Sequence, residues 1–107
     1  MTTNFDDPAA SVRSHLDSLG VAYEVLDCDP DLADTAAFCQ AYGVAPDDSA
    51  NTIIVIGKSE PPVYVACVVL ATTRLDVNGA VRRRLGVRKA SFASGDETKA
   101  LTGMLIG

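Results

Sequence analysis

Five of the nine basic residues form one cluster near the C-terminal end, namely Arg82, Arg83, Arg84, Arg88 and Lys89. Of the 14 acidic residues, 11 lie at or before Glu60, and the net charge of the chain is −5. An acidic protein with one basic segment does not coat nucleic acid non-specifically, but it can hold a phosphate-bearing ligand at one edge. Three consecutive arginines fan around a helix at about 100° per residue, so a solubilising surface is the alternative interpretation.

The remaining residues with reactive side chains form no pattern that pairs a nucleophile with a base. Cys28, Cys39 and Cys67 are odd in number and widely spaced, no CxxC occurs, and His15 is the single histidine. We therefore expect reduced, partly buried thiols, with no zinc site and no disulfide. The sequence contains no Walker loop, GxGxxG, nucleophile elbow or HExxH motif, so we expect no metal and no cofactor.

Length and composition are typical of one globular domain. The chain has 107 residues, of which 48% are hydrophobic, which is enough for a single core and too many for a disordered segment. Its longest apolar run is about half of the roughly 20 residues that a membrane-spanning helix needs. The first seven residues contain neither a basic segment nor an apolar stretch, so we expect no signal peptide and a cytoplasmic location.

Two long apolar runs form the centre of the chain, Asn51–Lys58 and Val63–Ala71, and both are rich in β-branched residues. The intervening Ser59–Pro62 is polar and contains two prolines, which is typical of a hairpin connection. We therefore predict that Ile53–Ile56 and Val65–Leu70 are adjacent antiparallel strands. Neither run alternates cleanly between apolar and polar residues, so we expect both faces of the hairpin to be covered.

Helices are predicted on both sides of this hairpin from capping residues and apolar periodicity. The first runs from Pro8 to Leu19, with Asp7 as its cap. Further helices are predicted from Asp34 or Thr35 to Tyr42, from Asp76 or Asn78 to Leu85, and from Glu97 to Leu101, and short strands at Val21–Asp27 and Arg88–Ala93.

Several segments of this chain recur in a fixed order in a known family. The first is Gly43–Ile53, which is similar to a family segment that ends in Lys-Thr-Leu/Ile. Leu75-Asp76-Val77 then precedes a basic helix, followed by Leu85–Lys89 and by the ending Thr102–Gly107. In this order and spacing the chain resembles, over nearly its whole length, the YbaK/EbsC family of aminoacyl-tRNA deacylases, which is related to the editing domain of bacterial prolyl-tRNA synthetases.

The resemblance implies a fold and a reaction. The fold would be α+β, with a compact, mixed and mostly antiparallel barrel-like sheet and flanking helices, in a single domain over residues 1–107. The family continues beyond the position of Gly107, so we expect this domain to lack its C-terminal strands. The reaction would be hydrolysis of tRNA mischarged with a small amino acid, such as alanine or cysteine on proline tRNA, with help from the substrate's own groups.

The resemblance also implies a site. Asn51 occupies the position of the family's lysine and Gly107 begins its carbonyl-binding loop, so both are the candidate catalytic residues. Thr52 and Gly103 are candidate substrate-binding residues, and the basic cluster is a candidate tRNA contact. The alternative is a non-catalytic module that binds tRNA, an aminoacyl nucleotide or a synthetase, because asparagine lacks the charge of lysine. A homodimer is also expected if a sheet edge stays open.

Overall fold

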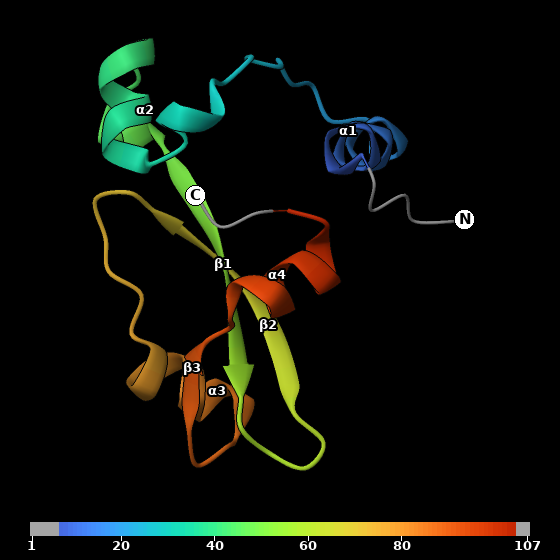
Figure 1. Cartoon of the computed structure of the whole chain (residues 1–107), viewed down its shortest axis with the longest axis vertical. Coiled ribbons are helices and arrows are strands. Elements are labelled where there is room, and N and C mark those ends of the chain that lie inside the picture. Colours follow the sequence, from blue (N-terminus) through green and yellow to red (C-terminus); the bar gives the residue numbers. More distant parts are fainter. Residues whose placement is uncertain (1–6, 105–107) are drawn as a thin grey trace. The chain divides into compact units, whose positions relative to one another are not determined.

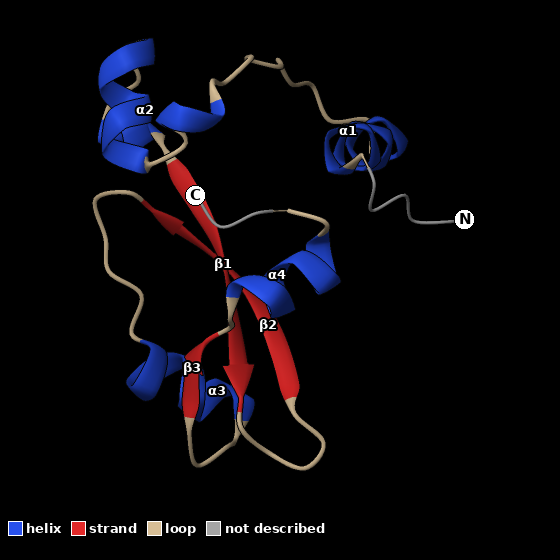
Figure 2. Ribbon diagram, in the orientation of Figure 1, coloured by secondary structure: helices blue, strands red, loops and turns tan. Residues whose placement is uncertain are grey.

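The computed structural model describes residues 7–104 (Figures 1 and 2). These residues belong to two compact units. The larger unit is residues 28–93, and it contains the sheet. The smaller unit combines the two ends of the chain, residues up to 27 and residues from 94 onward. Each unit is described by itself.

The sheet of the larger unit is built around the predicted hairpin. Strand β1 is Ala50–Gly57, β2 is Val63–Leu70 and β3 is Ala90–Phe92. In the described residues the strand order is β2-β1-β3 and both pairings are antiparallel (Figure 2). The predicted adjacent strands and the α+β class are therefore confirmed, and the described sheet is open rather than closed.

The core of this unit lies on one face of β1. Val55 is completely buried, and Val77 and Ala90 are buried against it. Ile53 and Leu75 pack on this cluster. Because side chains alternate along a strand, Asn51, Ile53, Val55 and Gly57 share this face, which we call the core face.

The expectation that both faces of the hairpin are covered is wrong for β2. Its residues alternate between half-buried and exposed from Tyr64 onward. Val65 and Cys67 are on the core face and pack on the core cluster, whereas Val68 is 70% exposed and Leu70 is also exposed. The uninterrupted apolar sequence of β2 therefore belongs to a strand that is covered on one face only. Sequence alone does not show this, because β-branched side chains also occur on exposed faces.

Short helices flank the sheet within residues 28–93. Helix α2 is Thr35–Tyr42, with Asp34, one of the two predicted caps, at its start and Gly43 in the left-handed region at its end. Its Cys39 is buried and Phe38 is half-buried, whereas Ala36 is exposed. The predicted basic helix begins as a π-helical turn, η3 (Val77–Val81), and continues as α3 (Arg82–Leu85). Two 3₁₀ turns, η1 (Pro30–Leu32) and η2 (Pro46–Asp48), complete the unit.

The described residues of the smaller unit form two helices. Helix α1 is Pro8–Ser18, which begins at the predicted cap Asp7, and α4 is Gly95–Thr102, where Ser94 and Glu97 form a capping box. The predicted strand Val21–Asp27 does not form. Its apolar side chains are exposed, and the described residues provide no partner strand, without which extended backbone groups have no ladder to join. No helix within residues 7–104 is long and apolar enough to cross a membrane.

Candidate functional site

Asn51 lies one residue into β1, on the core face of the sheet, and is half-buried. Thr35, the first residue of α2, donates its hydroxyl hydrogen to Asn51 Oδ1 over 3.1 Å in a partly buried contact. Asp34 caps the same helix end by accepting from the Ala37 amide. The Thr35 hydroxyl therefore occupies Oδ1 and identifies the other side-chain atom as the amide nitrogen. This nitrogen carries two N–H donors, and neither donates to an acceptor among the described residues.

Thr52 and Asn51 point to opposite faces of β1, because successive side chains of a strand alternate. Thr52 is exposed and lies opposite Val68 on β2. The substrate-binding role of Thr52 stays a prediction. If Thr52 binds substrate, it does so on the face of the sheet opposite to Asn51.

Gly103, one of the two glycines of the predicted site, lies outside the sheet unit. Gly103 ends α4 in the left-handed region with φ 75°, where its N–H donates to the Lys99 carbonyl over 2.8 Å. A residue with a side chain is strained at such φ values, which explains a glycine at this position. Gly107 lies outside the described residues. The roles of both glycines stay predictions.

The basic cluster belongs to the sheet unit, on α3 and the turn that leads to β3. Arg82 is half-buried, and its Nε donates to the Asn78 carbonyl over 2.7 Å. It therefore supports the first turn of this helix instead of extending into solvent. The other four residues of the cluster are exposed: Arg83, Arg84, Arg88 and Lys89. Four exposed cations in one short segment can pair with phosphates.

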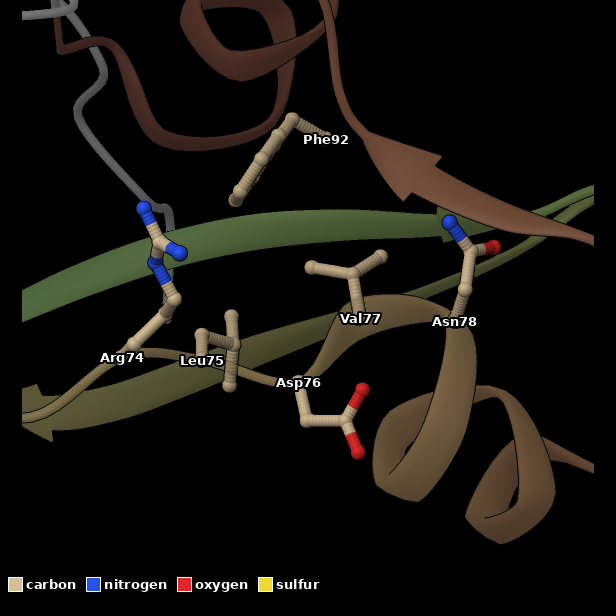
Figure 3. Close-up of a pocket in the computed structure, with 6 residues that line it drawn as sticks. All are labelled: Arg74, Leu75, Asp76, Val77, Asn78 and Phe92. Atoms are coloured by element: carbon tan, nitrogen blue, oxygen red, sulfur yellow. The ribbon is translucent and has the colours of Figure 1, made fainter.

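An open pocket of about 630 Å³ lies beside this basic helix (Figure 3). Phe92 of β3 is on one side, and the segment that leads into η3 forms the other. The lining residues are Arg74, Leu75, Asp76, Val77, Asn78 and Phe92. Phe92 pairs with Val55 in the β1–β3 register, so its side chain stands on the core face, the face that also carries Asn51.

Sequence reasoning missed this pocket. Leu75-Asp76-Val77 stands out in the sequence only as part of a family pattern, and nothing local connects Arg74 with Phe92, which is 18 positions further along the chain. The pairing of β3 with β1 brings them together. An aromatic residue within a run of small residues, positions 90–95, is the one local signal that could have indicated Phe92.

Comparison with known protein families provides an independent result. A family model described as "Aminoacyl-tRNA editing domain" matches residues 29–107. The match covers the whole sheet unit apart from its first residue, and it confirms the resemblance found in the sequence. No curated protein and no solved structure matches the chain.

Proposed function

Because this chain belongs to the aminoacyl-tRNA editing domain family and has a role in tRNA editing, we propose that it is a hydrolase. Its substrate would be a tRNA mischarged with a small amino acid, of the alanyl or cysteinyl type on proline tRNA. In the reaction, water adds to the carbonyl carbon of the aminoacyl ester and the carbonyl oxygen becomes an oxyanion. The bond from that carbon to the ribose oxygen then breaks, the proton released by water goes to the ribose oxygen, and free amino acid and tRNA result.

The observation that carries this proposal is the orientation of Asn51. Its oxygen accepts from the Thr35 hydroxyl, so its N–H donors are available to a substrate. A pre-oriented donor stabilises the oxyanion more strongly than it stabilises the ground-state carbonyl, and such a donor acts without a charge. Asn51 is thus the donor to the carbonyl oxygen, and Thr35 is a positioning residue that fixes the rotation of the amide.

The test is deacylation of a panel of mischarged tRNAs by the parent chain and by variants at these two positions. Loss of one oxyanion donor costs about 10²–10³ in rate, so we expect this loss in kcat for Asn51→Ala. Asn51→Lys should keep or raise activity, because an ammonium group adds a charge-assisted hydrogen bond. Thr35→Val should lower kcat with little change in KM, whereas Thr35→Ser, which keeps the hydroxyl, should match the parent.

A non-catalytic binding module is the second candidate function, and one observation favours it. The residue at the mouth of β1 is neutral, and within residues 7–104 its side chain bonds only to a hydroxyl. Such a site can bind an aminoacyl nucleotide or a tRNA end without hydrolysing it, alone or together with a synthetase. This candidate becomes the better one if the parent hydrolyses no member of the panel and Asn51→Lys gains nothing. Hydrolysis by the parent that neither Asn51 variant alters would exclude Asn51 from the reaction.

A further inference from the structure

The aromatic ring of Phe92 is unusually exposed for its place in the fold. It is 59% exposed, although its neighbours Ala90 and Ala93 are 4% and 7% exposed. Its ring stands over the open pocket, on the opposite side from buried Val77 (Figure 3). An exposed ring beside an apolar floor can stack on a flat ligand, and base stacking on such rings is how proteins hold unpaired nucleotides.

Polar groups stand at the two ends of this pocket. Figure 3 shows Arg74 at one end and Asn78 at the other, with the hydrocarbon of Leu75 and Val77 between them. Arg74 is exposed, and its guanidinium has no hydrogen bond or ion pair with any described residue. Arginine binds phosphate oxygens through its planar fork and also stacks on aromatic faces and bases.

The one carboxylate of the pocket is already engaged. Both oxygens of Asp76 accept backbone hydrogen bonds, from Gly79 over 2.9 Å and from Ala80 over 3.1 Å. In Figure 3 this carboxylate points away from Phe92 and toward the helix. Its charge therefore caps η3 and does not face the pocket, so an anionic ligand would meet the Arg74 cation instead.

A lining residue of the pocket is in contact with the first residue of the basic cluster. Asn78, which lines the pocket, is bonded through its carbonyl to Arg82, the first residue of the cluster. An aromatic surface, an exposed arginine and a nearby group of cations together form the pattern expected for the end of a nucleic acid strand. A purely apolar ligand would need neither Arg74 nor the cluster.

We propose that this pocket holds the 3′-terminal nucleotide of the tRNA, with its base against Phe92 and its phosphate on Arg74. The inference rests on the proposed function, because the RNA is the substrate of that reaction. Asn51 is four residues before Val55, the partner of Phe92, on the same face, which places it about 13 Å along the strand. A nucleoside with an ester-linked amino acid is of this length, so its ester would reach Asn51.

The test compares the binding of two uncharged tRNAs, one intact and one lacking its 3′-terminal nucleotide, measured by competition at fixed salt. We expect the intact tRNA to bind the parent roughly tenfold more tightly, as for one stacked base. Phe92→Leu should remove this difference and Phe92→Tyr should keep it. Arg74→Gln should weaken the intact tRNA more than the shortened one. Tyr64→Leu is the matched control, an aromatic-to-aliphatic change on the opposite face of the sheet, and it should keep the difference.

These outcomes separate the two proposals. If the parent binds both tRNAs equally, or binds neither, the pocket does not take the terminal nucleotide, whatever the deacylation assay finds. If Phe92→Leu folds and keeps the full difference, the inference is equally overturned. If Phe92→Leu does not fold, the exposed Arg74 provides the test. Arg74→Gln must then reduce the difference in affinity between the intact and the shortened tRNA, and an unchanged difference overturns the inference. If the parent distinguishes the two tRNAs but deacylates no mischarged tRNA, the inference about the pocket stands and the proposed hydrolysis is contradicted.

Discussion

Two hydrogen bonds between side chains, one in each unit, fix the orientation of the residues that they join. In the sheet unit, the Thr35 hydroxyl orients the Asn51 amide. In the smaller unit, the Tyr23 hydroxyl donates to Asp17 Oδ1 over 2.8 Å, which joins the residues after α1 to the helix. The first bond is relevant to catalysis and the second to the conformation of an otherwise irregular segment.

The Tyr23 bond predicts a pH effect. The hydrogen bond to Asp17, together with desolvation and the carboxylate charge, raises the pKa of Tyr23 above its ordinary value of 10.0, although Arg13 opposes the shift. Because the pKa is raised in the folded state, the stabilisation is complete below about pH 10 and is lost as pH rises through the folded pKa. Asp17→Asn should lower the pKa of Tyr23. NMR titration of the labelled tyrosine ring measures it, and an unchanged pKa would contradict the assigned cause.

The elements that shape the site are the turn η3 and the strand β1. In η3, Asp76 closes the first turn, and Gly79 lies directly beneath its carboxylate. A Cβ on residue 79 would overlap that carboxylate. The start of this helix therefore depends on a glycine at position 79 and on the capping carboxylate of Asp76, three residues earlier.

Gly79→Ala should displace the Asp76 cap and cost about 0.5–2 kcal/mol, the usual cost of losing an N-cap. Denaturant unfolding measures the change. If the clash with the carboxylate is the cause, the same substitution should cost little in an Asp76→Ala background, because the capping bonds are already absent there. If the substitution costs the same unfolding free energy in both backgrounds, the clash with the Asp76 carboxylate is not the cause.

Burial along the hairpin predicts where truncation is costly. Val55 is completely buried, so Val55→Ala removes two methyl groups and leaves a cavity, at a cost of about 2–3 kcal/mol in unfolding free energy. The matched control is Val68→Ala on β2, which makes the same chemical change at 70% exposure and should stay within about 0.5 kcal/mol. Ile54, which is half-buried, should fall between them. Similar costs for both valines would mean that the core is not on this face.

At the scale of the whole molecule, charge is divided along the chain. The net charge is −5, yet four exposed cations lie close together in sequence on α3 and the next turn, and Arg74 and Lys58 are also exposed in the same unit. A net negative charge repels RNA, so the exposed cations are the groups that can attract it. This arrangement favours one defined contact over many weak ones.

The salt dependence of tRNA binding tests this arrangement. Replacing Arg83, Arg84 and Arg88 by alanine should weaken affinity, and it should reduce the slope of log K against log salt by about one for each phosphate that the variant no longer binds. Arg13→Ala, an exposed arginine of α1, is the control and should leave the slope unchanged. An unchanged slope in the triple variant would assign the cluster to solubility.

The sequence alone was sufficient for the features that depend on neighbours within a few residues. The central hairpin and the cap at Asp7 were predicted, and Asp34 and Asp76 were each one of two predicted caps, because β-branched runs and capping side chains act locally. The candidate role of Asn51 also came from the sequence, through its place in a family pattern.

Tertiary structure decided the rest. Residues 21–27 have a strand-like composition, but a strand needs a partner, and only the folded chain determines whether one is present. The exposed face of β2 and the meeting of Phe92 with Arg74 likewise depend on which segments pack on the sheet. Such contacts join residues far apart in sequence, where local periodicity carries no information about pairing.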